Sequence, residues 1–289
     1  MQFTDSHCHL DFTEFQHELP QLLAQCQQRN INRIIVPAVN PEHWQRVLSL
    51  SALTNNSAVS ISCSLGIHPW YLILQNNSLS NEPIKFFDPA YHEHQLNKTI
   101  QQQSKMNSYG NIVAVGECGI DVFKAKKNTE SEQEFTENLK LQQGFFEMQL
   151  QLAKQNNLPV IVHHCQSHHL ILPLLKQNKL NRAGVIHAFS GSYQQAKAYV
   201  DLGFKLGVGG TITYARSKKT IDAIKRIPLT SLLLETDAPA MPLYGQQGQI
   251  NTPLNLLTIF NALATIRDET EPVLAKQIEY NVDSLFFSH

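Results

Sequence analysis

Apolar stretches rich in Val, Ile and Leu recur along the whole chain, and stretches with helical periodicity separate them. The strand candidates lie near residues 2–8, 31–39, 58–66, 111–118, 158–164, 183–189, 203–213 and 231–237. Most of them lack polar alternation, which is typical of parallel strands buried on both faces. Helical patterns cover roughly 13–29, 41–55, 91–108, 129–156, 167–179, 192–202, 217–226, 251–267 and 271–287. This repeated alternation of strand and helix predicts an α/β fold, the (β/α)₈ TIM barrel.

We expect one domain over residues 1–289, because no break in composition divides the chain. A doubly wound open sheet is the alternative arrangement of the same elements. It would spread the ends of strand candidates one, four, five, six and eight over tens of ångströms, whereas a barrel brings them to one mouth. The long polar segment 71–90 is expected to be either a lid over that mouth or an ordinary surface insertion.

Histidines and carboxylates stand at the ends of five of these apolar runs, and this placement predicts a shared metal site. The residues are His7, His9, Glu117, His163, His187 and Asp237. Residues two apart in a strand share a face, so His7 and His9 can converge on one ion while Cys8 faces away. Imidazole and carboxylate ligands suit Zn²⁺, Mn²⁺ or Mg²⁺. The set is typical of a hydrolase that uses two divalent metal ions.

Two of these residues are also expected to be catalytic. A carboxylate can bridge two ions through its two oxygens, and Glu117, from the middle of the series, is the natural bridge. Ions roughly 3.5–4 Å apart can hold a bridging hydroxide and stabilise charge on a phosphoryl group. Asp237, at the end of the last strand candidate, can bind a metal and accept a proton from the attacking water.

Charge and cysteine content limit the partners and the compartment. The formal net charge is −1, so a broad basic face for coating DNA is not expected, and contact with DNA should be local and directed at an end. No apolar stretch approaches the roughly 18 residues needed to cross a membrane, and no secretory signal is recognisable. The five cysteines have no CxxC spacing, which indicates reduced thiols in the cytoplasm. We expect a monomer.

Candidate substrate contacts are less specific than the metal ligands. His68 ends the third strand candidate and either contacts substrate or is structural. Arg216, Lys218 and Lys219 follow the seventh strand candidate, where barrels often bind phosphate, although such a run is also typical of a solvated helix start. Several aromatic residues near strand ends either stack on bases or are buried under loops; they are Trp70, Tyr71, Phe189, Tyr193 and Tyr214.

At these positions the chain resembles the TatD-type metal-dependent DNase family of the amidohydrolase superfamily. The likeness lies in DSHCHLDF (5–12), GIHPW (66–70), VGECGID (115–121), LPVIVHH (158–164), GVIHAFSGS (184–192), LGVGGTITY (206–214) and LLLETDAP (232–239). GGTITYARSKKT and LLLETDAPAMPLYGQQGQINTP are most similar to its YjjV-like bacterial branch. The resemblance implies a barrel, a divalent metal pair and hydrolysis of DNA phosphodiesters, with 3′→5′ exonuclease action in some members. It also implies one metal at His7, His9, Glu117 and Asp237, and another at Glu117, His163 and His187.

The chain departs from the family pattern at Cys165, where an arginine is usual two residues after the histidine of the fifth strand. Arginine suits bidentate phosphate binding, so with cysteine at this position the sequence does not decide which class of substrate is bound. One alternative is an amidohydrolase-type ester or amide hydrolase, such as a D-aminoacyl-tRNA deacylase. Another is a metal-dependent nucleic-acid-binding protein without turnover, against which the intact Asp237 argues.

Overall fold

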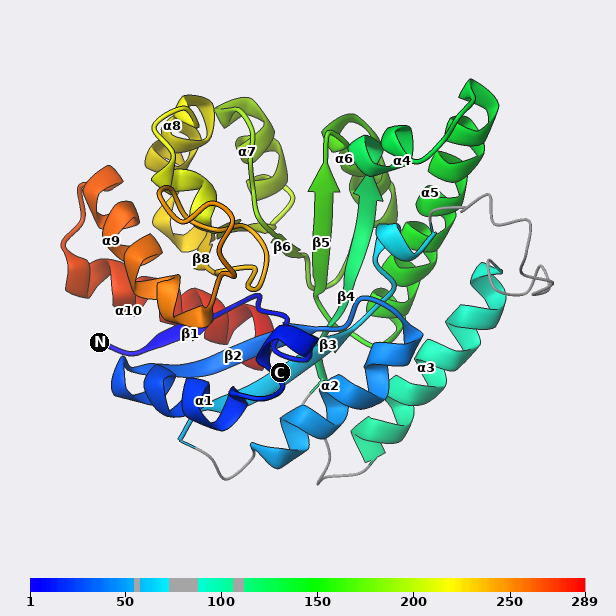
Figure 1. The fold of residues 1–289 in the computed structure, drawn as a ribbon. Coiled ribbons are helices and arrows are strands. Elements are labelled where there is room, and N and C mark those ends of the chain that lie inside the picture. The colour runs from blue at the N-terminus through cyan, green and yellow to red at the C-terminus, as the bar shows by residue number, and fades with distance from the viewer. Residues whose placement is uncertain (55–57, 73–87, 106–111, 289) are drawn as a thin grey trace.

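A parallel sheet curls into a barrel in the computed structural model, which describes residues 1–54, 58–72, 88–105 and 112–288 (Figure 1). Its strands are β1 (Phe3–Asp5), β2 (Ile31–Pro37), β3 (Ser60–Leu65), β4 (Ile112–Asp121), β5 (Val160–Cys165), β6 (Gly184–Ile186), β7 (Lys205–Val208) and β8 (Leu232–Leu234). Each strand pairs in parallel with the next along the chain. Beyond the first and last strands, Ser6 N donates to Leu234 O and Asp237 N donates to His7 O, which closes the ring. The (β/α)₈ barrel predicted from the sequence is therefore confirmed.

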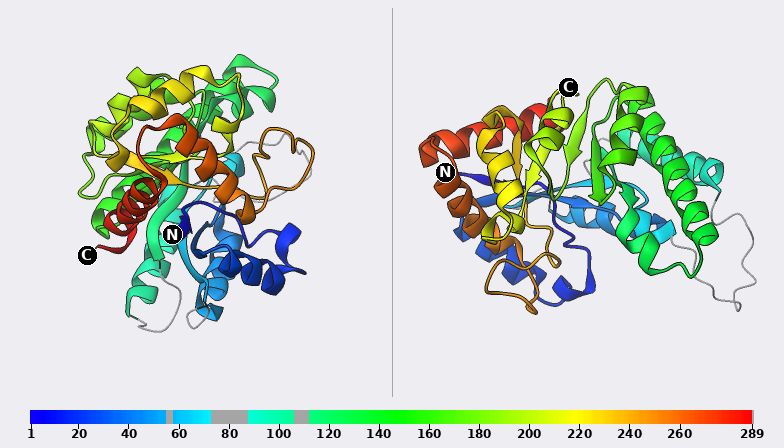
Figure 2. Two further views of the ribbon diagram at one scale, coloured as in Figure 1. Left: turned by 90° about the vertical axis from the view of Figure 1, so that its left-hand side faces the viewer. Right: turned by 90° about the horizontal axis from the view of Figure 1, so that it is seen from above.

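Helices surround the sheet, as two further views show (Figure 2). They are α1 (Leu19–Gln28), α2 (Pro41–Leu53), α3 (Pro89–Lys105), α4 (Val122–Lys127), α5 (Glu132–Gln155), α6 (His168–Asn178), α7 (Tyr193–Val200), α8 (Lys218–Arg226), α9 (Leu256–Ile266) and α10 (Glu271–Val282). The start of α2 shows how the local sequence sets a helix boundary. The side chain of Asn40 accepts a hydrogen bond from His43 N, and Pro41 occupies the first helical position of α2, as the Asn40-Pro41 pair predicts.

The differences from the sequence-based expectations include two element boundaries and one short helix. The helix expected over 13–29 begins at Leu19, after a 3₁₀ turn at Thr13–Phe15, because Pro20 suits the first turn of a helix. The strand expected over 203–213 ends at Val208, and a 3₁₀ turn follows at Gly210–Thr213. The short helix α4 was not predicted, since its six residues are too few to show a helical period.

Apolar side chains fill the barrel interior below the polar residues. Ile35, Ile161, Val185 and Leu233 belong to one buried cluster. Because they come from strands on different sides of the barrel, they face its axis. Residues of the C-terminal segment, Val282, Leu285 and Phe286, belong to the same cluster and cover the floor of the barrel. Since strand side chains alternate, the residues two positions further along these strands also face the axis, above this apolar layer.

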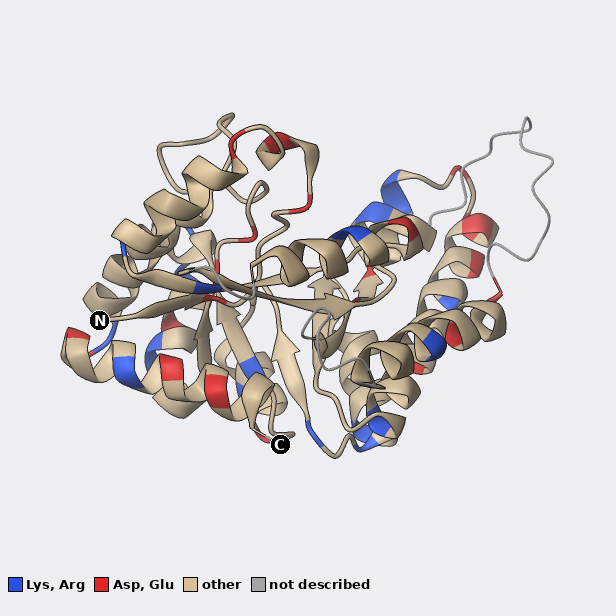
Figure 3. Ribbon diagram, turned by 90° about the horizontal axis from the view of Figure 1, so that it is seen from below, with Lys and Arg blue, Asp and Glu red and all other residues tan. Residues whose placement is uncertain are grey.

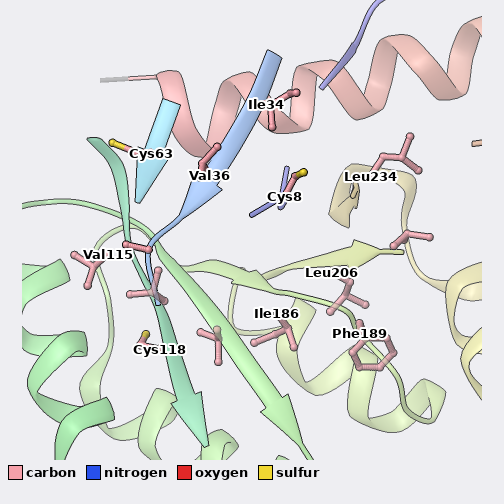
Figure 4. Close-up of a cluster of buried hydrophobic side chains, with 14 of the residues drawn as sticks. Cys8, Ile34, Val36, Cys63, Val115, Cys118, Ile186, Phe189, Leu206 and Leu234 are labelled. Carbon is pink, nitrogen blue, oxygen red and sulfur yellow. The ribbon is translucent and has the colours of Figure 1, made fainter. Parts of the chain in front are cut away.

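The opposite faces of the strands form a larger core beneath the helices. Figure 4 shows Ile34 and Val36 of β2 in this core, together with Cys8 and Cys118. Both thiols are fully buried and point away from the neighbouring histidines and Glu117, as strand alternation predicts. All five cysteines are free.

Most of the segment 71–90 considered as a lid falls on residues 73–87, which lie outside the described residues. Its first residues belong to a 3₁₀ turn, η2 (Pro69–Leu72). Within the described part of the chain, no helix has the length and apolar character needed to cross a bilayer.

Candidate metal centre

The histidines and carboxylates singled out in the sequence come together at one end of the barrel. They are His7, His9, Glu117, His163, His187 and Asp237. Glu117 lies within β4 and His163 within β5. The other four lie just beyond strand ends: His7 and His9 after β1, His187 after β6 and Asp237 after β8. The two histidines that follow β1 are in contact, with their Nε2 atoms 3.3 Å apart.

Glu117 lies at the centre of this cluster, with its two oxygens facing different histidines. Oε2 is 3.2 Å from His7 Nε2 and 3.5 Å from His9 Nε2. Oε1 is 3.1 Å from His163 Nδ1 and 3.4 Å from His187 Nε2. A carboxylate that meets two groups of nitrogen donors through separate oxygens has the arrangement needed to bridge two cations.

An irregularity in β4 directs Glu117 toward the barrel axis. The register with β5 shifts between Val115 and Cys118, and Gly116 has a φ of +141°. A β-carbon at this glycine would lie 2.6 Å from Ile161 O. Only glycine combines that conformation with so close an approach of two backbones.

Asp237 reaches the Oε2 side of the cluster, where its Oδ1 is 3.6 Å from His7 Nε2 and 3.5 Å from His9 Nε2. The turns that carry these residues are tied together by Asp5. Its carboxyl group accepts hydrogen bonds from His7 N at 3.2 Å and from the Thr236 hydroxyl at 2.6 Å. Burial raises the pKa of Asp5 to about 8, so this group is a structural link rather than a charge for the site.

The electrostatics of the cluster favour a bound cation. Glu117, Glu235 and Asp237 are carboxylates in or beside the cluster, and in the described part of the chain none of them forms an ion pair with lysine or arginine. Burial would raise the pKa of Glu117, but His68, His7 and His187 hold it well below its usual range. Burial would likewise lower the pKa of His187, yet the three carboxylates raise it to about 10. Buried negative charge without a permanent counter-charge is costly, and nitrogen and oxygen donors of this kind fit divalent metals.

His68, which was expected either to contact substrate or to be structural, contacts Glu117 at the centre of the cluster. Its Nε2 is 3.2 Å from Glu117 Oε1, and its Nδ1 accepts a hydrogen bond from Trp70 N. The nitrogen that accepts this bond has no proton, so a neutral His68 has its proton on Nε2. Burial lowers the pKa of His68 to about 4, which keeps the ring neutral. His68, Glu117 and His163 also form one of the groups able to hold a metal ion.

Two further carboxylates orient the histidines of the Oε1 side. Asp121 Oδ2 is 3.1 Å from His163 Nε2; burial would raise the pKa of Asp121, but hydrogen bonds from His163 and Trp70 lower it to about 2. Glu235 Oε1 is 3.1 Å from His187 Nδ1. Glu235 was not predicted from the sequence, although its position two residues after an inward-facing leucine of β8 indicates that it faces the axis.

A cavity of about 720 Å³ opens above the cluster. His9, His68, Glu117, His163, His187 and Asp237 all line it. His164 and Cys165 line the β5 side, so the position where the family usually has arginine carries no cation here. Lys124 and Lys127 of α4, the helix that directly follows β4 and contacts β5, also line the cavity; they were not predicted from the sequence.

The residues of the predicted anion patch, Arg216, Lys218 and Lys219, do not line this cavity. Arg216 is exposed and lines a smaller cavity of about 230 Å³, with its guanidinium 4.9 Å from the centre of the Tyr214 ring. Thr211 and Met241 line both cavities, so the two adjoin. Lys218 and Lys219 are exposed at the start of α8 and line neither.

Comparisons with known proteins agree with this geometry. The sequence profile of the family described as TatD related DNase matches residues 4–287. Two bacterial relatives, each described as an uncharacterized metal-dependent hydrolase, are 38% identical to this chain. For YjjV of Escherichia coli K12 the match covers 99% of this chain and 98% of the relative. For the protein of Haemophilus influenzae the match covers 99% of this chain and 100% of the relative.

Solved structures show the same fold. The crystal structure of YjjV, described as a TatD homologue, superposes with a TM-score of 0.80 at 36% identity, covering 99% of this chain and 98% of that one. A TatD family hydrolase from Entamoeba histolytica has a TM-score of 0.79 at 17% identity, covering 99% of this chain and 98% of that one. This second likeness concerns the fold alone.

Proposed function

This chain belongs to the TatD-related DNase family and is a metal-dependent hydrolase; from that premise we propose that it hydrolyses phosphodiester bonds of DNA, removing nucleotides from a 3′ end. The proposal includes two divalent cations, Mg²⁺, Mn²⁺ or Zn²⁺, at the histidine and carboxylate cluster. The observation that supports it best is the arrangement of Glu117, whose two oxygens face separate groups of histidines.

In this proposal each cation has its own ligands. His7, His9, Glu117 and Asp237 hold one, and Glu117, His163 and His187 hold the other. Two cations bound in this way supply Lewis acidity, which promotes ionisation of water and stabilises negative charge on phosphoryl oxygens. Without them the cluster presents buried carboxylates and would repel a phosphodiester, so binding of DNA also depends on metal.

Asp237 is the proposed general base. Its Oδ1 faces His7 and His9, and Oδ2 is then the oxygen that accepts a proton from the attacking water. Burial would raise the pKa of Asp237, but the nearby His187 and the hydrogen bond with His9 lower it. The group is therefore ionised at neutral pH, which is the state that a general base requires.

His68 is the proposed contact with the scissile group. Its neutral ring presents an N–H at Nε2 toward the centre of the cluster, where it can donate to a phosphoryl oxygen. Asp121 and Glu235 hold His163 and His187 in fixed orientations, which raises the basicity of histidine ligands. Arg216, Lys218 and Lys219 remain predicted contacts for the strand outside the main cavity.

A 5′-labelled oligodeoxynucleotide, single-stranded or annealed to its complement, tests the proposal in the presence of Mg²⁺, Mn²⁺ or Zn²⁺. We expect a ladder of shortened products that requires divalent metal, and the same oligonucleotide labelled at its 3′ end should lose the label first. Asp237→Asn protein of measured metal content is the control for a contaminating nuclease. Metal-loaded protein that leaves every oligonucleotide intact but hydrolyses an aminoacyl ester would reject the phosphodiester assignment.

A further inference from the structure

One wall of the cavity contains none of the proposed metal ligands or catalytic groups. It is formed by η2 and by α4, which contribute Trp70, Phe123, Lys124 and Lys127 to the lining. Trp70 and Phe123 are each 52% exposed. Single exposed aromatic residues are common on protein surfaces, but these two border the same cavity and stand beside two lysines. We call these four residues the α4 wall.

Trp70 is held in a fixed orientation although half of its surface is exposed. Its Nε1 donates a hydrogen bond to Asp121 Oδ2 at 2.6 Å. Lys124 Nζ lies 4.6 Å from the centre of the indole ring. Asp121 also caps α4, because its Oδ1 accepts from Lys124 N at 2.7 Å. A rigid aromatic ring loses little entropy when a flat ligand stacks on it.

The fixed positive charge of the cavity is concentrated on this wall. Among the described residues that line the cavity, Lys124 and Lys127 are the only lysines or arginines. Three of the six residues of α4 are lysines, which are blue in Figure 3. An anionic ligand in this cavity is therefore attracted both by the cations proposed at the cluster and by these two ammonium groups.

We propose that the α4 wall is a subsite for the nucleotide next to the scissile phosphodiester of single-stranded nucleic acid. The base stacks on Trp70 and Phe123, and a backbone phosphate lies at Lys124 and Lys127. Aromatic rings interleaved with cations form the usual platform for single strands, which every base can use because each has a π-face. A duplex hides these faces between paired neighbours, so the subsite selects unpaired ends. This inference rests on the proposed function for its scissile bond.

Tryptophan fluorescence tests the stacking directly, because the chain has two tryptophans in different environments. Trp44 is buried and donates to Gly66 O, whereas Trp70 faces the cavity. A short oligothymidylate with phosphorothioate linkages, which resist cleavage, is titrated into metal-loaded protein. Trp44→Phe leaves Trp70 as the only emitter. We expect saturable quenching by the single strand, and binding at least about tenfold weaker for the corresponding duplex.

Lysine variants test the phosphate contact with a matched control on the same helix. Lys126 is exposed and does not line the cavity, so Lys126→Ala removes the same charge at a neutral position. Lys124→Ala and Lys127→Ala should each reduce the salt dependence of binding, by about 0.7 in the slope of log K against log salt. Lys126→Ala should leave both the affinity and the slope unchanged. Equal effects of all three substitutions would reject a local contact and leave only general attraction.

Aromatic variants complete the test. Loss of one stacked base typically weakens binding by about 5- to 150-fold, so Phe123→Ala and Trp70→Ala should fall in this range. Trp70→Phe should restore most of the affinity, because it keeps a ring although it loses the bond to Asp121. If Trp70→Phe binds as weakly as Trp70→Ala, the effect comes through Asp121, and the stacking role is wrong.

Hydrolysis of bis(p-nitrophenyl) phosphate separates this subsite from the proposed function. This small diester tests the metal chemistry without a nucleic-acid strand. If it is hydrolysed but oligothymidylate does not quench Trp70, the subsite is wrong and the proposed function stands. If no phosphodiester is cleaved but quenching and the lysine pattern are found, the subsite stands and the proposed function is wrong. Equal binding of duplex and single strand would reject the preference for unpaired ends.

Discussion

Gly207→Ala is expected to weaken metal binding without changing any proposed ligand. Gly207 lies in β7 beside Glu235, and a β-carbon added there would lie 2.1 Å from Oε2 and 2.5 Å from the carboxyl carbon. Ordinary contact begins near 3.4 Å, so the carboxylate must move by more than 1 Å. A shift of this size breaks the 3.1 Å contact between Glu235 Oε1 and His187 Nδ1. His187 then loses the group that orients its ring.

The expected effect has two parts. Overpacking at a buried site typically costs about 1–3 kcal/mol, which in a protein of this size lowers Tm by roughly 2–12 °C. Loss of a carboxylate that orients a metal-binding histidine typically lowers metal affinity by about 10- to 100-fold. The second effect is the diagnostic one, since a merely destabilised protein that remains folded keeps its affinity.

Competition between metal-free protein and a chromogenic chelator measures this affinity. Gly209→Ala is the matched control, because its β-carbon would lie 3.7 Å from the nearest atom, Glu235 O, which is ordinary contact. Unfolding curves of both variants establish that each is folded at the temperature of the titration. If folded Gly207→Ala protein binds metal as tightly as the parent, Glu235 does not orient His187 and the reasoning is refuted.

Four other perturbations test the proposed metal site and the barrel core. Asp237→Asn should lower kcat by about 10²–10⁴-fold in protein whose metal content has been measured, and native turnover by the fully metal-loaded variant would contradict the general-base role. His163→Ala should instead lower metal occupancy first, and excess cation should partly restore its activity. Chelation of the metal should lower Tm in a thermal scan, because cations at 100 times their Kd stabilise the folded state by about 2.7 kcal/mol; an unchanged Tm would argue against metal at the buried cluster. Ile161→Ala should lower the free energy of unfolding in urea by about 2–5 kcal/mol through the cavity left inside the barrel, and a loss well below about 1 kcal/mol would show that the apolar layer repacks.

Much of the proposed site could be predicted from the sequence because strand geometry is regular. The period of two in a strand places His7 and His9 on one face, and parallel strands bring their carboxyl ends to one edge. The same rule applied to β8 would have identified Glu235. What the rule cannot supply is orientation: the irregular part of β4 decides which way Glu117 points, and this depends on the close approach of Gly116 to β5.

Loops and short helices were the least predictable parts. Lys124 and Lys127 lie on a helix of six residues, where no period is visible, and their position at the cavity depends on the path of the chain after β4. Arg216 and Lys218 follow β7 as predicted, but a 3₁₀ turn at Gly210–Thr213 intervenes. The chain consequently reaches the main cavity at Thr211 and turns away before these basic residues.

The strands that close the ring are the first and the last of the barrel, and this has a consequence for biosynthesis. His7 is synthesised well before Asp237, whose backbone N–H bonds to His7 O. The residues that seal the floor, Val282, Leu285 and Phe286, emerge later still. A nascent or prematurely terminated chain therefore has the histidines of one proposed metal site without the carboxylate that completes it. The order of synthesis therefore delays completion of the proposed metal site until the first and last strands of the barrel have both been made.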